Sequence, residues 1–277
     1  GDAITAAMKD PEFEQPDTPF GEASGPILVG TLGKTEIAFL SRHGSGHCYN
    51  PCMVPYAANI FALKKLGVTT LIASGAVGSL REEIQPGHLV LVDQFIDKTT
   101  RRQNTFFDQF GAVHCELSHP CCRRLREKLM VAAEKVNTIT HADGTYVCME
   151  GPQFSTRAES LMHRAWGGDL IGMTAMPEAK LAREAQMCYA LVALASDYDC
   201  WREHDANADK QSLLAEIIGN LQNATSNAVD LIEQVLVDDM DLCDDTCDCR
   251  KSLELAVWTK PESIDSKTKS TLAPLFE

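Results

Sequence analysis

Short apolar runs alternate along the chain with stretches whose apolar residues recur at the helical period. The expected strands are Ile27–Leu32, Ile37–Ser41, Thr70–Ser74, Leu89–Phe95, Thr145–Met149, Leu170–Met173 and Tyr189–Ser196. The expected helices are Pro55–Leu66, Cys121–Val136, Thr156–Ala165, Pro177–Gln186 and a long amphipathic helix with apolar residues at 3.6-residue spacing from Leu214 to Val235. This alternation predicts an α/β fold, a single domain with a mixed, mainly parallel β-sheet flanked by helices.

The chain changes character after about residue 237, where it becomes acidic and rich in cysteine. We therefore interpret residues 1–237 as the main domain and residues 238–277 as an acidic, Cys-containing tail packed on it. Eleven cysteines are too few for a disulfide scaffold in a chain of this length. Most of them, such as Cys188 in its apolar strand, are expected to be buried reduced thiols in a cytoplasmic protein, although Cys148 and Cys188 lie on separate strands and could pair.

Cys243, Cys247 and Cys249 in the tail are compatible with free thiols, disulfides or a metal site. Three cysteines at this spacing lack an obvious fourth ligand, and six aspartates between positions 238 and 248 do not suit a structural zinc site. The sequence therefore predicts no bound metal.

The formal net charge of −14 argues against a nucleic-acid partner, because binding to the phosphate backbone requires a surface rich in lysine and arginine. It does not exclude a small anionic ligand in a locally positive pocket. No apolar run approaches the length of about 18 residues that a membrane span requires, so no membrane partner is expected.

Two carboxylates follow the most apolar of the expected strands, at Asp197 and Asp199. Ligands of open α/β sheets bind at the carboxyl ends of the strands, and alternation along a strand places both acids on the same side. Paired carboxylates suit a site that donates a proton and also accepts hydrogen bonds. The structural alternative is an Asp-rich turn or a helix cap.

Two further strand ends carry residues suited to an anion. Arg42 and His43 precede Gly44 directly after a strand and would present a guanidinium and an imidazole to an oxyanion. The small-residue segment that begins at Ser74 offers backbone N–H groups that can cradle phosphate or lie flat against a base. A solvated arginine beside a capped turn is the structural alternative for the first motif, and an ordinary α/β turn is the alternative for the second.

Two later segments add hydroxyl groups and an aromatic face. Gly151-Pro152 forces a turn before Phe154, which offers a stacking face, and Thr156 and Glu159 have the spacing of a capping box. Farther along, Thr174 precedes a helix that begins near Pro177, where a helix N-terminus favours an anion. For the first segment taken in isolation, the structural alternative, with Phe154 as a core residue and Ser155 as a helix cap, is favoured.

The order of these segments resembles that of the 5′-methylthioadenosine phosphorylases, which belong to the trimeric purine nucleoside phosphorylase fold family. The resemblance extends from about Asp17 to Leu236. It rests on six motifs, namely Arg-His-Gly at Arg42, Ala-x-Gly-Ser-Leu-Arg-Glu at Ala76, Asp-Gln-Phe-Ile-Asp-Lys-Thr at Asp93, Glu-Gly-Pro-x-Phe-Ser-x-Arg-Ala-Glu-Ser at Glu150, Gly-Met-Thr-x-x-Pro-Glu at Gly172 and Ser-Asp-Tyr-Asp-Cys-Trp at Ser196.

The resemblance implies a pentosyltransferase that cleaves a purine nucleoside with inorganic phosphate, here 5′-methylthioadenosine to adenine and 5-methylthioribose 1-phosphate. No cofactor is implied, since phosphate is a co-substrate. The resemblance also implies a homotrimer or a hexamer of trimers. In such an oligomer, the resemblance implies that His114 reaches the 5′ side of the ligand bound to the neighbouring subunit.

The resemblance assigns the remaining roles residue by residue. Phosphate is assigned to Arg42, His43, Gly75, Ala76 and Thr174, the purine to Val77, Gly78, Phe154, Ser155, Asp197 and Asp199, and the ribose to Met173 and His47. Asp197 and Asp199 are the catalytic candidates. Burial beside Asp199 is expected to raise the pKa of Asp197 above its usual value of about 3.9, so that it can donate a proton to purine N7. A carboxylate also accepts from the 6-amino group of adenine and repels a 6-oxo group, and 6-oxopurine relatives carry asparagine here.

The sequence departs from the family pattern in several places. Relatives begin with a strand and a Gly-Gly-[Ser/Thr]-Gly loop. We expect Gly1 to be a remnant of this loop and the residues before it to be missing from the sequence. Gly75 and Gly172 stand where some relatives have threonine and asparagine, and the lost hydroxyl at Gly75 is expected to weaken phosphate binding modestly. Lys210 falls near the apolar pocket for the 5′-methylthio group, where Leu213 and Leu214 remain available as a wall.

Three other functions compete with this interpretation. Histidine phosphatases also use Arg-His-Gly, but that assignment leaves the two aspartates and the Phe154 motif without a role. A purine- or metal-binding protein without turnover is a second alternative. The third is a broader purine nucleoside phosphorylase that acts on adenosine or 6-oxopurine nucleosides.

Overall fold

The computed structural model describes residues 2–202, 209–238, 242 and 245–277, and its centre is a seven-stranded sheet in the order β6-β8-β9-β4-β10-β5-β7. Its strands are β4 (Thr70–Ser79), β5 (Leu89–Leu91), β6 (Gln94–Asp97), β7 (Thr140–His141), β8 (Thr145–Cys148), β9 (Leu170–Gly172) and β10 (Cys188–Asp197). The pairs β6–β8, β8–β9, β4–β10 and β5–β7 are parallel, whereas β4–β9 and β5–β10 are antiparallel. The prediction of a mixed, mainly parallel sheet is confirmed.

Strands β4 and β10 form the middle of this sheet. They pair in parallel from Cys188 opposite Thr70 to Asp197 opposite Gly78. Every residue of β10 except Asp197 is buried, because alternate side chains enter two separate hydrophobic clusters on the two faces of the sheet. The uninterrupted apolar run in the sequence therefore reflects a strand that is covered on both sides.

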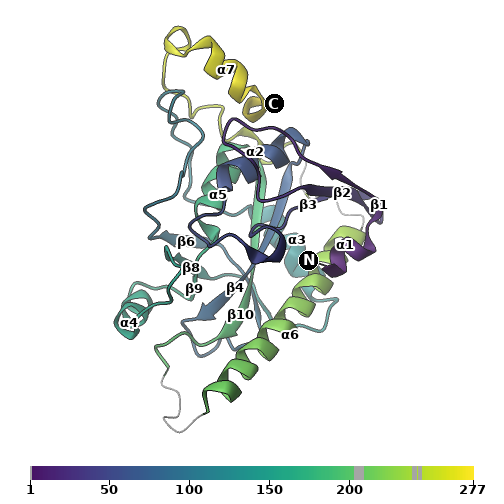
Figure 1. Cartoon of the computed structure of the whole chain (residues 1–277), viewed down its shortest axis with the longest axis vertical. Helices are drawn as coiled ribbons and strands as arrows, with labels where there is room; N and C mark the ends of the chain where they lie inside the picture. Colours follow the sequence, from purple (N-terminus) through teal and green to yellow (C-terminus); the bar gives the residue numbers. More distant parts are fainter. Residues whose placement is uncertain (1, 203–208, 239–241, 243–244) are drawn as a thin grey trace.

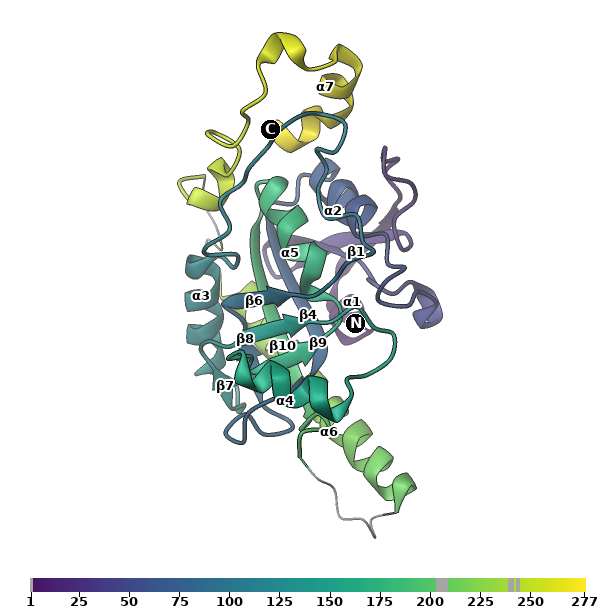
Figure 2. The same ribbon diagram turned by 90° about the vertical axis from the view of Figure 1, so that its left-hand side faces the viewer.

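Helices cover both faces of the sheet. The helices α2 (Tyr56–Lys65) and α5 (Ala175–Glu184) contribute to one cluster, and α3 (Arg123–Ala133) and α6 (Lys210–Val237) contribute to the other (Figure 1 and Figure 2). Near the carboxyl end of β8, α4 (Arg157–Ala165) begins with the predicted capping box between Thr156 and Glu159. In the second half of α6, Ala224, Ala228, Leu231, Val235 and Leu236 are buried. Leu214 and Ile218 in its first half are exposed, where the helix extends beyond the body of the molecule.

Two of the predicted strands lie in a second, smaller sheet. Strands β2 (Ile27–Leu32) and β3 (Thr35–Phe39) pair antiparallel, and β1 (Lys9–Glu14) adds a third antiparallel strand. Only Gly33 and Lys34 separate β2 from β3, and Gly33 has a φ of 63°. So short a link permits only a hairpin, so these two strands cannot be parallel neighbours. Helix α1 (Asp2–Ala7) precedes this sheet, and neither α1 nor β1 is predicted from the sequence.

The C-terminal segment packs against the same cluster as α2. It contains α7 (Ser266–Leu272) and the 3₁₀ helices η2 (Asp248–Lys251), η3 (Pro261–Ser263) and η4 (Ala273–Phe276). Leu272 and Leu275 are buried with Phe61 of α2, and the Gln186 side chain donates to the Leu275 carbonyl at 3.0 Å. In both views the C-terminal end of the chain lies near α2, and α7 lies beyond it (Figure 1 and Figure 2). None of the described helices is long and apolar enough to cross a membrane.

The cysteines differ from expectation at one position. Cys188 is disulfide-bonded, so its assignment as a reduced core thiol is wrong. Cys148, its possible partner on a separate strand, is a free buried thiol, because it lies in the cluster on the opposite face of the sheet. Cys247 and Cys249 are also free and buried, and Cys243 lies outside the described residues.

Candidate active site

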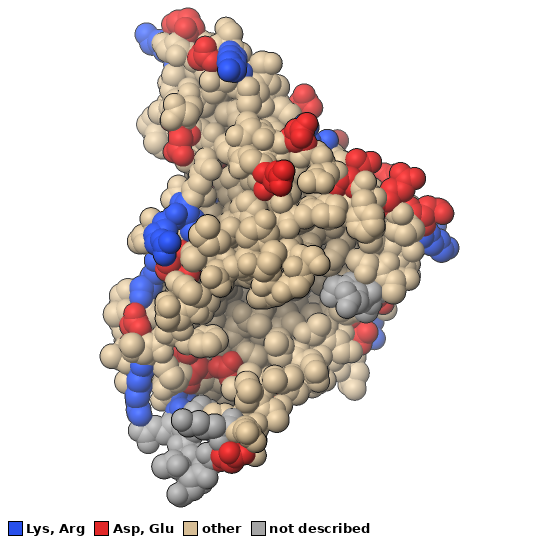
Figure 3. Space-filling view, viewed as in Figure 1, with Lys and Arg blue, Asp and Glu red and all other residues tan. Residues whose placement is uncertain are grey.

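The segments that follow β3, β4 and β10 meet the start of α5 on one side of the molecule. A cavity of about 310 Å³ borders the β3 side of this region, and its lining includes Arg42, His43 and Ser74 together with residues of α6. Figure 3 shows that the same face is hollowed across its middle and that uncharged residues line most of the hollow.

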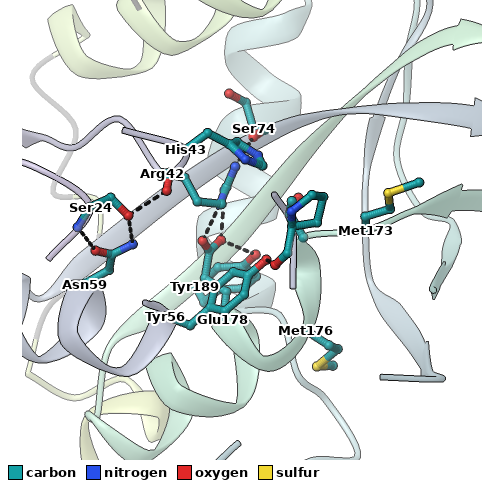
Figure 4. Close-up of polar contacts among 12 residues, drawn as sticks. Ser24, Arg42, His43, Tyr56, Asn59, Ser74, Met173, Met176, Glu178 and Tyr189 are labelled. Carbon is teal, nitrogen blue, oxygen red and sulfur yellow. Dashed lines mark hydrogen bonds and ion pairs between the residues drawn. The ribbon is translucent and has the colours of Figure 1, made fainter. Parts of the chain in front are cut away.

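Arg42 is held in a fixed orientation by a buried carboxylate (Figure 4). Its Nε donates to Glu178 Oε2 at 2.6 Å and its Nη2 donates to Oε1 at 3.0 Å, while Nη1 donates to the Ser74 carbonyl at 3.0 Å. Tyr189 also donates its hydroxyl to Glu178 at 3.0 Å. The ion pair keeps the pKa of Arg42 well above its ordinary value in spite of burial. The guanidinium is therefore permanently charged and connects the turn after β3 to β4.

His43 lies next to Arg42 and is neutral at physiological pH. Its Nδ1 lies 2.8 Å from the Tyr49 carbonyl, so Nδ1 carries the proton and Nε2 is left with a lone pair. Burial lowers the pKa of His43, and the ring stacks on His47 with centroids 4.2 Å apart. In this tautomer Nε2 can accept a hydrogen bond from the P–OH of hydrogen phosphate. His47, assigned to the ribose, thus lies at the anion-binding end of the site.

Thr174 stands opposite Gly75 of β4. A Cβ placed on Gly75 would lie 3.4 Å from the Thr174 hydroxyl oxygen, so the backbone of Gly75 and Ala76 and this hydroxyl line the same space. The backbone N–H of Thr174 donates to the Tyr146 hydroxyl at 3.3 Å. The structure brings Thr174 and Gly75 together with Arg42, whose Nη1 is bonded to Ser74 next in sequence.

Gly172 leaves room for the side chain of Tyr146, a packing role that its sequence motif did not indicate. A Cβ at this position would lie 2.0 Å from the hydroxyl oxygen of Tyr146 and 2.5 Å from its ring carbon Cζ. Tyr146, fully buried, therefore occupies the space that a side chain at position 172 would need. With Tyr146 in this place, glycine is the residue that fits at position 172.

Asp197 and Asp199 converge at the carboxyl end of β4. A Cβ on Gly78 would lie 3.3 Å from Asp197 Oδ1 and 3.1 Å from Asp199 Cβ, so both acids lie close to the same glycine. The Ser196 hydroxyl donates to Asp197 Oδ2 at 2.7 Å, and the Ser160 hydroxyl of α4 donates to Asp199 Oδ2. The two acids thus lie together, as strand alternation predicts.

The remaining purine-pocket candidates are divided between the core and the surface. Val77 is buried, and its carbonyl oxygen lies 3.2 Å from the Ser196 hydroxyl oxygen. Ser155 lies near the acids because its carbonyl accepts from the Cys200 thiol at 3.2 Å. Phe154, by contrast, is 86% exposed, so its ring does not belong to the core of this chain and is available to a ligand or a second chain.

Met173 is covered by the Gly151-Pro152 turn, and a buried arginine fixes both segments. A Cβ on Gly151 would lie 2.5 Å from the Met173 sulfur. Arg102, whose side chain is 2% exposed, donates to the carbonyls of Met173 and Glu150 at 2.6 and 2.7 Å and forms an ion pair with the Glu150 carboxylate. The sequence analysis missed Arg102 because it lies in an aperiodic segment that carries no motif.

His114 packs on the C-terminal segment. His114 is exposed, its N–H donates to the Ala256 carbonyl at 2.9 Å, and its ring packs edge-on against Trp258 at 4.8 Å. Lys210 begins α6, but its side chain and residues 203–208 lie outside the described part of the chain, as does Gly1. The predicted 5′ pocket and the predicted remnant of the phosphate loop therefore stay predictions.

Comparison with known proteins agrees with this geometry. The profile of the phosphorylase superfamily matches residues 3–237. The S-methyl-5′-thioadenosine phosphorylase of Cereibacter sphaeroides is 45% identical over 265 residues, which cover 96% of this chain and 90% of the relative.

Two solved structures extend the agreement to three dimensions. A methylthioadenosine phosphorylase from an antarctic soil metagenomic library has a TM-score of 0.90 at 40% identity, covering 98% of this chain and 94% of that one. The methylthioadenosine phosphorylase of Schistosoma mansoni in complex with adenine has a TM-score of 0.80 at 30% identity, with 97% and 93% covered. The chain therefore belongs to the phosphorylase superfamily and, within it, to the methylthioadenosine phosphorylases.

Proposed function

We propose that the protein converts S-methyl-5′-thioadenosine and inorganic phosphate to adenine and 5-methylthioribose 1-phosphate. The observation that carries this proposal is that two kinds of group lie next to each other along β4. Arg42 and Thr174 lie by Ser74 and Gly75, and the carboxylates of Asp197 and Asp199 lie by Gly78. In phosphorolysis the phosphate attacks C1′ of the sugar while the purine leaves from the same carbon. A phosphorylase therefore needs an anion site and a purine site next to each other. The names and the adenine complex of the relatives support the substrate.

In this proposal Arg42, His43 and Thr174 hold the phosphate, with the backbone of Gly75 and Ala76 completing the cradle. The arginine supplies a fixed charge, and neutral His43 accepts the P–OH hydrogen bond. Because the guanidinium is already oriented by Glu178, binding phosphate costs little side-chain entropy. The phosphate then attacks C1′ as the bond to the purine breaks.

Asp197 assists the departing base. Negative charge builds on the purine as the glycosidic bond breaks, and a protonated Asp197 donates to N7, a contribution typically worth about 10²–10⁴-fold in rate. The Ser160 hydroxyl holds the second carboxylate, that of Asp199, in place beside Asp197. Val77 and Gly78 form the floor of the purine site, Phe154 and Ser155 its edge, and Met173 and His47 contact the ribose.

We also propose a homotrimer, or a hexamer of trimers, that works in the cytoplasm without a metal or organic cofactor in catalysis. The support is the exposed pair of His114 and Trp258, the latter 71% exposed, which would lie at a subunit boundary and reach the neighbouring ligand. Residues 1–237 form the catalytic domain and residues 238–277 the tail in this proposal. Neither nucleic acid nor membrane is a partner.

A broader purine nucleoside phosphorylase remains the second candidate, because one solved relative is named an adenosine/methylthioadenosine phosphorylase. The test is to incubate the protein with methylthioadenosine, adenosine and inosine, each with and without phosphate, and to quantify the released base. Adenine released only with phosphate, and fastest from methylthioadenosine, is the expected result. Equal rates from adenosine would favour the broader enzyme, and base release without phosphate would contradict phosphorolysis.

A further inference from the structure

Four cysteine sulfurs meet on the face of the sheet opposite to α2 and α5. Cys122, Cys188, Cys247 and Cys249 have Sγ atoms that all lie within 4.8 Å of one another. Each of the four residues is 6% exposed or less. Two of them belong to the main fold, at the start of α3 and of β10, and two belong to the C-terminal segment in and next to η2. The candidate catalytic site uses none of them.

Their separation matches that of ligands around a tetrahedral ion. A zinc–sulfur bond of about 2.3 Å places the sulfurs of a regular tetrahedron about 3.8 Å apart. Cys122 Sγ and Cys247 Sγ lie 3.7 Å apart. Four thiolates complete a closed structural zinc site, so the absence of an obvious fourth ligand in the tail is resolved by the two cysteines of the main fold.

The backbone fixes the ligands before any ion binds. The N–H of Cys122 donates to the Tyr189 carbonyl at 2.7 Å, and the N–H of Cys188 donates to the Thr69 carbonyl at 2.9 Å, which ties both to β10 and its neighbour. On the other side, the N–H of Arg250 donates to the Cys247 carbonyl at 2.8 Å and closes the turn that carries Cys249. A rigid donor set of this kind lowers the entropy cost of metal binding.

The charges around the cluster favour a zinc ion bound by four thiolates. Zinc with four thiolates carries a net charge of −2, which must be compensated when it is buried. Four arginines (Arg123, Arg124, Arg126 and Arg183) and three acids (Asp93, Glu116 and Asp248) line a cavity of about 430 Å³ next to the cluster, so its lining carries a net formal charge of +1. Cys122 also precedes the first turn of α3, where the helix dipole stabilises a thiolate.

We propose that the reduced protein binds one Zn²⁺ through Cys122, Cys188, Cys247 and Cys249, and that this ion fastens the C-terminal segment to the main fold. Cys188 is disulfide-bonded in the structure, so the metal-binding form requires reduction. A dithiol reductant supplies two electrons and two protons, the S–S bond breaks into two thiols, and the dithiol becomes a disulfide. Zinc then displaces one proton from each of the four coordinating thiols.

The test measures metal content in the full-length protein. The chain is produced with zinc in the medium, purified without oxygen in the presence of a phosphine reductant, and analysed by mass spectrometry for zinc per chain. About one zinc per chain is expected in the wild type, falling at least about tenfold in Cys247→Ser and Cys249→Ser. Cys121→Ser is the matched control, since Cys121 is buried and adjacent in sequence but does not belong to the cluster, and it should retain the zinc.

Cobalt gives a second measurement that needs no variant. Co²⁺ exchanged into the reduced wild type should show the thiolate-to-cobalt charge-transfer bands and the intense visible bands of a tetrahedral sulfur site. A reduced wild type without zinc would overturn the proposal. So would zinc that persists in Cys247→Ser and Cys249→Ser, or a cobalt spectrum without thiolate bands.

Discussion

Glu178 binds the Arg42 guanidinium through both of its carboxylate oxygens, at 2.6 and 3.0 Å, across 136 positions of sequence. The pair is largely buried, with side-chain exposures of 16% for the arginine and 9% for the glutamate. It fixes the plane of the guanidinium while Nη1 binds the Ser74 carbonyl. The guanidinium is thus held in one orientation by contacts within the protein itself.

Replacing Glu178 should damage both stability and phosphate binding. In Glu178→Ala the Arg42 charge loses its partner in a buried setting, which typically costs about 3–5 kcal/mol of unfolding free energy. We expect that loss in urea unfolding, together with a raised KM for phosphate. Glu127→Ala removes an exposed ion pair with Arg123 and is the control, for which about 0.5 kcal/mol or less is expected. Equal effects of the two substitutions would contradict the role assigned to Glu178.

Gly172→Ala should destabilise the protein, whereas Gly75→Ala should leave its stability almost unchanged. Gly172→Ala places a methyl group 2.0 Å from the Tyr146 hydroxyl oxygen, and overpacking in a dense core costs about 1–3 kcal/mol or more. Gly75→Ala meets nothing closer than the Thr174 hydroxyl at 3.4 Å, so its melting temperature should change little. Thermal unfolding of the two variants checks this contrast, and a stable Gly172→Ala protein would refute the packing argument.

Glu184 should make stability fall as pH rises. Burial raises the pKa of Glu184 to about 7, although its carboxylate accepts hydrogen bonds from Thr105 and Phe106. Between the ordinary value of 4.5 and about 7 the folded state keeps this proton while the unfolded state loses it. The stabilisation is therefore present below pH 4.5 and is lost as pH rises through 7, by up to about 3 kcal/mol.

Glu184→Gln removes this dependence because an amide does not titrate in that range. The unfolding free energies of the wild type and the variant, measured from pH 4.5 to 8, should diverge in favour of the variant as pH rises. Glu127→Gln, at an exposed helical position, is the control and should follow the wild type. A pH-independent difference between the wild type and Glu184→Gln would show that Glu184 does not bind the proton.

Much of the central sheet can be predicted from the sequence because its strands are apolar and its helices carry local start signals. The β10 run and the Thr156–Glu159 capping box are both confirmed in place. Strand β1 is missed because all six of its residues are exposed and one is proline, so it lacks any hydrophobic alternation. Local patterns cannot show a strand whose only support is its pairing with β2.

The candidate site residues also divide into those that a local sequence pattern indicates and those that only a tertiary contact reveals. Arg42, Thr174 and Asp197 lie at motif positions next to strand ends, where the sequence indicates chemistry. Glu178 lies within a motif too, but its neighbour Arg42 is remote in sequence, so the motif suggests only a helix-start acid. The cysteine cluster likewise joins residues from position 122 to position 249, and no spacing rule connects them.

The central claim is that Asp197, at the end of β10, protonates and recognises adenine. The most direct measurement compares kcat/KM for methylthioadenosine and inosine, at saturating phosphate, in the wild type and in Asp197→Asn. We expect the substitution to lower the value for methylthioadenosine by about 10²–10⁴-fold and to shift the preference toward inosine, because an amide can donate to the 6-oxo group. An unchanged preference for methylthioadenosine in Asp197→Asn would contradict the account.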